Sequence, residues 1–127
     1  MKIEHIALWV SDLEKMREFY TRYFSGKANA LYTNRVKQFQ SYFITFEDGC
    51  RLELMHRPDI ADRNKAGILL GPAHFAVSVG NRATVDSLTA ELEKDGYAVL
   101  SGPRVTGDGY YESVIQDPEN NTIEITE

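Results

Sequence analysis

The chain shows a pattern of apolar and polar positions that occurs twice. Residues 3–10 are apolar and rich in strand-forming types, and Ser11-Asp12-Leu13-Glu14 follows as a Ser-x-x-Glu capping box, which predicts the start of a helix. Gly26 predicts the end of that helix. The apolar residues between them recur at helical spacing and predict one buried face: Leu13, Met16, Phe19, Tyr20, Tyr23 and Phe24.

The segments that follow predict further strands and then the same order again. Residues 38–47 and 51–56 are strand-like and joined at Asp48-Gly49, which is a hairpin signal, and residues 28–32 are a weaker strand candidate. Residues 57–71 show no clear period and predict a connection. After Pro72 the sequence predicts a strand at 74–79, a helix at 82–95 ended by Gly96, strands at 97–100, 110–116 and 122–126, and a turn at 101–103.

Matched residues in the two halves indicate an internal duplication. His5 corresponds to His74 at an offset of 69, and Glu53 corresponds to Glu124 at an offset of 71. A nearly constant offset over matched elements is typical of a repeat. We therefore predict an α+β fold in one domain, 1–127, made of two βαβββ modules at 1–56 and 72–127 with a linker at 57–71.

Strand alternation places the four matched residues on comparable faces. His5 shares a face with Ala7 and Trp9, whereas the residues between them are aliphatic, and Glu53, His74 and Glu124 follow the same rule. A single histidine or glutamate at such a position is usually a solvated residue. The same two residue types at matched positions in both halves favour a metal site instead. Two imidazoles and two carboxylates can bind a divalent cation and leave coordination positions for a substrate.

Composition narrows the classes of protein. The chain has 127 residues, 14 Lys plus Arg against 19 Asp plus Glu, and a net charge of −5, which argues against a nucleic-acid partner or an anionic membrane surface. No apolar run approaches the roughly 20 residues of a membrane helix. The single cysteine, Cys50, excludes an intramolecular disulfide, so we expect a cytoplasmic protein.

The sequence resembles the vicinal oxygen chelate superfamily (glyoxalase, bleomycin resistance protein and dioxygenase), and within it the short bacterial glyoxalase I type, which is lactoylglutathione lyase. The motifs that carry the resemblance extend over essentially the whole chain: His5 in Ile-Glu-His-Ile-Ala, residues 10–14 with Phe19-Tyr20, Glu53 in Arg-Leu-Glu-Leu-Met, His74 in Gly-Pro-Ala-His-Phe-Ala-Val, and the closing segment 117–124.

The resemblance implies a fold, a metal and a reaction. The two modules would form a curved mixed sheet around a metal-binding cleft, paired across a homodimer. The metal, Ni²⁺ or Co²⁺ in preference to Zn²⁺, would be bound by His5, Glu53, His74 and Glu124. The substrate would be a thiol–methylglyoxal hemithioacetal that isomerises through a metal-stabilised enediolate, with Glu124 as the proton-transferring base and Glu53 as its symmetric counterpart.

The sequence also departs from the glutathione-using relatives. Trp9 stands where those relatives carry an arginine after the first histidine, and the asparagine they place after the first glutamate is absent, with Arg57 nearby. The thiol therefore stays open, and so do other activities of the superfamily: a dioxygenase, an epimerase, a thiol transferase in antibiotic resistance, or a protein that sequesters a ligand without chemistry. Several residues could line an apolar cleft or bind an anionic group there: Trp9, Met55, Phe39, Phe43, Tyr110 and Tyr111, with Arg51 or Arg104.

Overall fold

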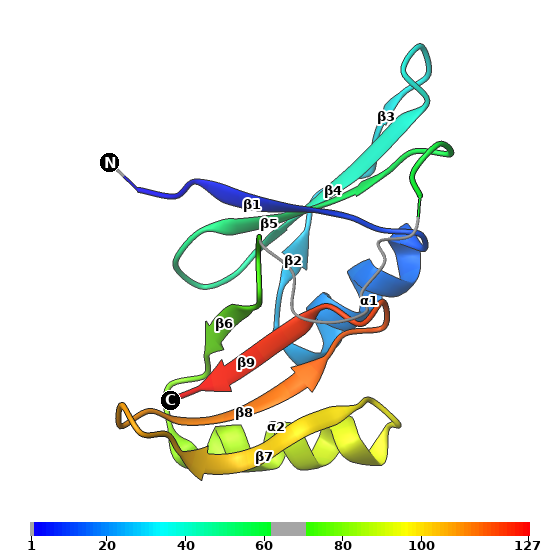
Figure 1. Cartoon of the computed structure of the whole chain (residues 1–127). Coiled ribbons are helices and arrows are strands. Elements are labelled where there is room, and N and C mark those ends of the chain that lie inside the picture. The colour runs from blue at the N-terminus through cyan, green and yellow to red at the C-terminus, as the bar shows by residue number, and fades with distance from the viewer. Residues whose placement is uncertain (1, 62–70) are drawn as a thin grey trace. The chain divides into compact units, whose positions relative to one another are not determined.

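The computed structural model describes residues 2–61 and 71–127, and the chain divides into two compact units, 1–64 and 65–127. Each unit has one helix and one mixed sheet, and each follows a βαβββ-like order (Figure 1). The predicted α+β class with two βαβββ modules is confirmed.

The first unit is built on a five-stranded sheet. Its elements are β1 (His5–Trp9), α1 (Leu13–Tyr23), β2 (Lys27–Ala28), β3 (Tyr32–Asn34), β4 (Phe39–Thr45) and β5 (Arg51–His56). The strand order is β1-β5-β4-β2, with β3 also paired to β4. Strand β1 runs parallel to β5, and the other pairs are antiparallel. The predicted strand at 28–32 is not continuous, because β2 and β3 overlap only its first and last residues.

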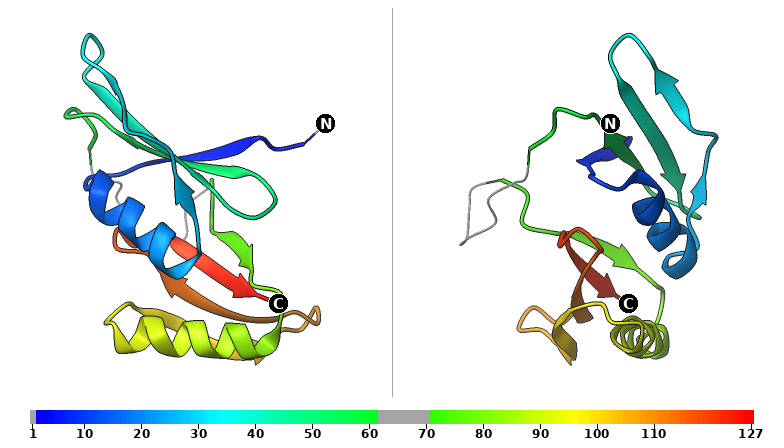
Figure 2. Two further views of the ribbon diagram at one scale, coloured as in Figure 1. Left: turned by 180° about the vertical axis from the view of Figure 1, so that it is seen from behind. Right: turned by 90° about the vertical axis from the view of Figure 1, so that its right-hand side faces the viewer.

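The core of the first unit lies between α1 and one face of this sheet (Figure 2). Alternation along β5 buries Leu52 and Leu54, while Met16 and Tyr20 of α1 are fully buried opposite them. The helix is capped by Asp12, whose side chain accepts a 2.9 Å hydrogen bond from the Lys15 amide. The cap is thus one residue later than the predicted Ser11, since either residue type can accept this bond.

The second unit repeats the arrangement with four strands. Its elements are β6 (Phe75–Ser78), α2 (Arg82–Lys94), β7 (Val99–Val105), β8 (Tyr111–Gln116) and β9 (Thr122–Thr126), in the sheet order β6-β9-β8-β7. Strand β6 is parallel to β9. Asn81 caps α2 by accepting a 2.9 Å bond from the Thr84 amide. Leu92 of α2 and Ile115 and Ile123 of the sheet are fully buried.

Strand β7 differs from the prediction. Residues 101–103 were expected to form a turn after a strand at 97–100, but the strand continues through Gly102 and Pro103 to Val105. It pairs with β8 with register shifts on either side of Ser101. Because β7 is at the edge of the sheet, the missing amide hydrogen of proline removes no bond that the ladder needs.

Most of the connection predicted at 57–71 lies outside the described residues, since 62–70 are not described. The module boundaries at 56 and 72 therefore stay a prediction. In residues 57–61, Arg57 forms a two-bond ion pair with Asp59, at 2.8 and 2.7 Å. In the part of the chain that the structure describes, no helix is both long and apolar enough to cross a membrane.

Candidate metal site

The first His–Glu pair is positioned by the parallel pairing of β1 with β5. In this register Ala7 is opposite Glu53, so His5, two residues earlier on β1, lies on the same face and diagonal to the glutamate. The His5 Nε2 atom is 3.9 Å from Oε2 of Glu53. The Glu53 side chain is 14% exposed and that of His5 is 41% exposed. The pair is therefore partly shielded by the sheet and open on one side.

A second carboxylate holds the other nitrogen of His5. The Nδ1 atom lies 2.5 Å from Oε2 of Glu4, and Arg51 donates a 2.8 Å bond from Nε to Oε1 of the same carboxylate. The hydrogen bond from His5, and after it that from Arg51, lowers the pKa of Glu4. Because an ionised carboxylate can only accept, Nδ1 carries the proton, and the lone pair of a neutral His5 is on Nε2, the nitrogen that faces Glu53.

Phe43 of β4 supports this arrangement from one side. Its ring meets the His5 ring edge-on at 5.5 Å, and the Arg51 guanidinium carbon lies 4.1 Å from the Phe43 ring centroid. Phe43 is opposite Glu53 in the β4–β5 register. The imidazole, the guanidinium and the ring thus limit one another's rotation.

The second His–Glu pair repeats the register of the first. On β6 and β9, Ala76 is opposite Glu124, and His74 again precedes the alanine by two residues. His74 Nε2 is 3.1 Å from Oε2 of Glu124, whose side chain is 21% exposed. The residue before His74 is Ala73, so this histidine has no counterpart of Glu4. The same pair geometry therefore arises twice, with a supporting carboxylate in one unit alone.

The donor atoms of each pair fit a divalent ion. Two ligands at right angles around an ion with bonds near 2.1 Å are about 3.0 Å apart. The 3.1 Å separation at His74 and Glu124 is close to that value, and the 3.9 Å separation at His5 and Glu53 needs a side-chain shift of less than about 1 Å. Within residues 2–61 and 71–127, no three His, Cys, Asp or Glu side chains form a group that could hold a metal. The structure thus brings the four predicted ligands together as two pairs, one within each unit.

The faces beside the two pairs differ in chemistry. In the first unit a row of paired positions crosses β1, β5, β4 and β3: Trp9, Met55, Ser41 and Tyr32. In the second unit the corresponding row across β6, β9 and β8 is Ser78, Thr126 and Glu112, and Arg104 of β7 pairs with Glu112 at 3.4 Å.

Of the residues expected to line an apolar cleft, Trp9, Phe39, Phe43 and Met55 share the face of His5 and Glu53. Tyr111 does not share the face of Glu124, because its hydroxyl donates a 2.6 Å bond to Asp86 on α2. This bond raises the pKa of Tyr111. Arg51 and Arg104, expected to bind an anionic group, are paired with Glu4 and Glu112.

Glu4 is the site residue that sequence reasoning missed. The sequence predicted a strand from residue 3, in which alternation puts Glu4 on the face opposite His5. In the structure β1 begins at His5, and Glu4 contacts its ring from the residue before the strand. The one signal in the sequence was a carboxylate directly beside a predicted histidine ligand.

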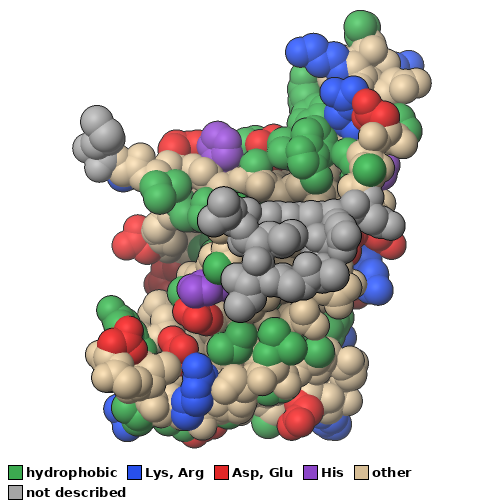
Figure 3. All heavy atoms as spheres, viewed as in Figure 1, with side chains coloured by type: hydrophobic (Ala, Val, Ile, Leu, Met, Phe, Trp, Pro, Cys, Tyr) green, Lys and Arg blue, Asp and Glu red, His purple; other side chains and the backbone are tan. Residues whose placement is uncertain are grey.

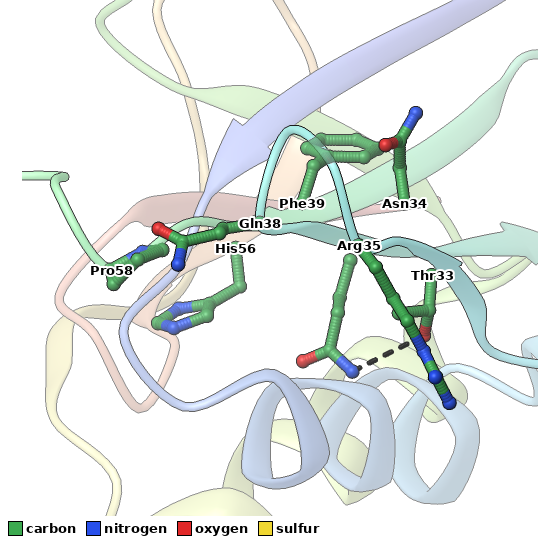
Figure 4. A pocket seen from close by; sticks show the side chains of 8 residues that line it. Thr33, Asn34, Arg35, Gln38, Phe39, His56 and Pro58 are labelled. Carbon is green, nitrogen blue, oxygen red and sulfur yellow. Dashed lines mark hydrogen bonds between the residues drawn. The ribbon is translucent and has the colours of Figure 1, made fainter.

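A separate cavity of about 310 Å³ lies at the turn between β3 and β4 and contains none of the four predicted ligands (Figure 4). Its lining is Thr33, Asn34, Arg35, Gln38, Phe39, Gln40, His56 and Pro58. His56 is half-buried at the end of β5, and its Nδ1 is 2.9 Å from the Val10 carbonyl oxygen. The contact ties the end of β5 to the residue after β1, which accounts for His56 structurally.

Comparison with known proteins identifies the fold family. The model of the Glyoxalase/Bleomycin resistance protein/Dioxygenase superfamily matches residues 2–125. The uncharacterized protein YqjT of Bacillus subtilis is 26% identical over 97% of this chain and 96% of its own length.

Solved structures show the same fold. A glyoxalase family protein from Enterococcus faecalis has a TM-score of 0.80 at 20% identity, with 99% of this chain and 97% of that chain covered. The trypanothione-dependent glyoxalase I of Leishmania major has a TM-score of 0.76 at 19% identity, over 99% and 86%. Glyoxalase I from Zea mays has a TM-score of 0.79 at 21% identity over 98% of this chain, which spans only 44% of the maize chain. Because the family model matches residues 2–125 of the 127, the chain belongs to the Glyoxalase/Bleomycin resistance protein/Dioxygenase superfamily.

Proposed function

We propose that this chain is a metal-dependent isomerase of the glyoxalase I type, a lyase acting on the hemithioacetal of a thiol and methylglyoxal. The observation that supports it most is the repeated pair: His5 with Glu53 and His74 with Glu124, each placed by the same register of parallel strands. A chance solvated histidine would not recur at the same register position beside a glutamate in both modules.

The four side chains would bind one divalent ion, Ni²⁺ or Co²⁺ by preference and Zn²⁺ as an alternative. When bound, such an ion supplies Lewis-acid polarisation of the two neighbouring oxygens of the substrate. The chain's own part begins with Glu4, which keeps the Nδ1 proton of His5 and so directs the Nε2 lone pair toward Glu53. Each glutamate is 14–21% exposed, so it is shielded from bulk water and still open to a ligand.

The proton transfer is assigned to Glu124, with Glu53 as its counterpart. In the reaction the carbon that carries sulfur loses its hydrogen as a proton and becomes the thioester carbonyl. The hydroxyl on this carbon also gives up its proton, which passes to the oxygen of the neighbouring carbonyl group. The neighbouring carbon itself receives the proton that the first carbon lost and becomes the alcohol carbon. One carboxylate oxygen of Glu124 can take up and return that proton, because it acts first as base and then as acid.

We also propose a homodimer, in which the metal site is completed within one chain or between two. Each module is too small to bury a good core by itself, which favours pairing of modules. The thiol stays open, since one structural neighbour is described as trypanothione-dependent.

The proposal is tested by metal analysis and a substrate panel. Protein purified without added metal is analysed for its elements and then loaded separately with Ni²⁺, Co²⁺ and Zn²⁺. Each form is assayed for conversion of methylglyoxal adducts of glutathione and of other small thiols. We expect activity in at least one metal form and a loss of at least about a hundredfold in kcat for Glu124→Gln. The matched control is Glu93→Gln, an exposed glutamate on α2 that should retain wild-type activity. Folded protein that takes up none of the three metals, or Glu124→Gln with full activity, would contradict the proposal.

A further inference from the structure

The open face of the first unit carries a cluster of aromatic side chains beside the His5–Glu53 pair. The Phe39 ring lies between two others, with its centroid 6.2 Å from that of Trp9 and 6.1 Å from that of Tyr32, and both contacts are edge-to-face. Although they pack on Phe39, Trp9 is 51% exposed and Tyr32 is 52% exposed. Hydrophobic side chains gather on this side of the β3–β4 hairpin in Figure 3. We call Trp9, Phe39 and Tyr32 the aromatic cluster.

The aromatic cluster offers π-faces and no charge. Its neighbours in the same register rows are Met55, Ser41 and Asn34, which are all uncharged at neutral pH. Ser41 is only 2% exposed, so the larger side chains cover the small one and form the surface. An uncharged, flat group suits this surface better than the carboxylates of a peptide thiol.

The spacing of the rows relates the aromatic cluster to the proposed ligands. The Ala7–Glu53–Phe43 row and the Trp9–Met55 row are two residues apart along the same strands, which is about 7 Å. This distance matches a small molecule with its two oxygens at Glu53 and a ring attached directly to the next carbon. Among the described residues of the second unit, 71–127, the corresponding row instead contains Thr126 and the Glu112–Arg104 ion pair.

We infer that the aromatic cluster binds an aromatic substituent on the carbon next to the two oxygens of the substrate, so that the hemithioacetal of an aryl-substituted 2-oxoaldehyde is preferred over that of methylglyoxal. The chelating part of this inference rests on the proposed metal site, and the aryl part rests on the aromatic cluster alone. Two separate measurements can therefore test the two parts.

The first measurement uses metal-free protein. Trp9 is the single tryptophan of the chain, so one indole N–H resonance in a ¹⁵N-labelled sample reports on the cluster. With EDTA present, titration with 2-naphthol should shift this resonance saturably, and Tyr32→Ala should weaken binding by about tenfold. The matched control is Leu100→Ala, which removes an apolar side chain of similar exposure, 55%, in the second unit and should leave the binding unchanged.

The second measurement uses the Ni²⁺-loaded protein and two α-hydroxy acids. Mandelate and lactate present the same two oxygens and differ by a phenyl in place of a methyl group. We expect mandelate to bind about tenfold tighter by calorimetry, and Tyr32→Ala to remove most of that difference. Protein that binds no Ni²⁺ would overturn the proposed function and leave the 2-naphthol result standing.

Three results would overturn the inference itself: no saturable indole shift, equal effects of Tyr32→Ala and Leu100→Ala, or equal affinity for mandelate and lactate. A shift that depends on protein concentration without ligand and disappears in Tyr32→Ala would assign the aromatic cluster to a second copy of the chain, and would also overturn it.

Discussion

The two modules share one backbone plan and differ in what they present on it. Both pair the first strand in parallel with the last, both place alanine opposite the glutamate, and both put a histidine two residues before that alanine. Beyond this pair, the first module offers aromatic rings and the second offers hydroxyls and an ion pair. The strand register therefore places the proposed ligands at matching positions in the two modules. The side chains around each pair differ and give each pair its own chemical surroundings.

The layers between helix and sheet diverge in the same way. In the first module Tyr42 donates a 2.6 Å bond from its hydroxyl to Glu14 of α1, at the partly exposed edge of the core. In the second module, Thr89 of α2 and Ser113 of β8 share a fully buried 2.6 Å hydrogen bond. The helix and the sheet are therefore joined by a hydrogen bond to a titratable carboxylate in the first module and by a hydrogen bond between two neutral hydroxyls in the second.

The largest difference between the modules is expected to come from the carboxylate of Glu4, which supports His5 and has no counterpart before His74. Glu4→Gln removes the anion that holds Nδ1 of His5, and we expect metal affinity to fall by about 10- to 100-fold. Ala73→Glu places a carboxylate before His74, the position that Glu4 has relative to His5, and should raise the affinity. Calorimetry with Ni²⁺ measures both, and equal affinity in Glu4→Gln and wild-type protein would show that the two histidines need no such support.

The glycines that follow the two helices are required for different reasons, close packing at Gly26 and a positive φ at Gly96. A Cβ at Gly26 would lie 2.4 Å from Cγ2 of Ile44, which is fully buried, so Gly26→Ala should cost about 2–3 kcal/mol of the free energy of unfolding. Gly96 has open space but a φ of +90°, so Gly96→Ala should cost about 1 kcal/mol. Urea denaturation compares the two variants, and a larger loss for Gly96→Ala would contradict this ranking.

The buried hydroxyl pair of the second module gives the next effect. Thr89→Val leaves the Ser113 hydroxyl buried without its partner, at a cost of about 1–2 kcal/mol of unfolding free energy. Adding Ser113→Ala removes the unsatisfied group, so the double variant should lose less than the sum of the two single losses. Denaturation of all four proteins under one condition measures the coupling, and strictly additive losses would refute it.

The titratable contact of the first module gives the smallest effect. The bond from Tyr42, and then that from Arg17, lowers the pKa of Glu14 below its ordinary value of 4.5. Its stabilisation is therefore fully present above pH 4.5 and is lost as pH falls through the lowered pKa. Because the carboxylate is largely exposed, Glu14→Gln should cost at most about 0.5 kcal/mol at pH 7, and less below pH 4. Thermal melts across this range check the trend, with the Thr89→Val loss as a pH-independent reference.

Most of the helices and strands could be predicted from the sequence, because they depend on the spacing of apolar residues along the chain. Alternation placed His5 and Glu53 on one face, and the matched offsets predicted the second pair, His74 and Glu124. Both helices were located by their apolar spacing, since a buried helical face needs that period whatever else surrounds it.

The features that were missed depend on tertiary neighbours. Glu4 is bound by Arg51 of β5 where it contacts His5, and Tyr111 turns toward Asp86 on a helix. Strand β7 continues through Pro103 because it is an edge strand. Local pattern does not contain these partners. The helix cap at Asp12 instead of Ser11 shows the same limit on a smaller scale. Serine and aspartate can both accept the capping hydrogen bond, so the local sequence did not distinguish them.

We propose that the two repeated pairs supply the ligands of one metal ion, within one chain or between two. Equilibrium dialysis of the wild-type protein against Ni²⁺ measures the metal bound per chain, and His5→Ala and His74→Ala are measured beside it. We expect one ion per chain in the wild type and at least about a hundredfold weaker binding in either variant, since each removes a ligand of the same ion. A wild type with no bound metal, or a variant that keeps its full affinity, would contradict it.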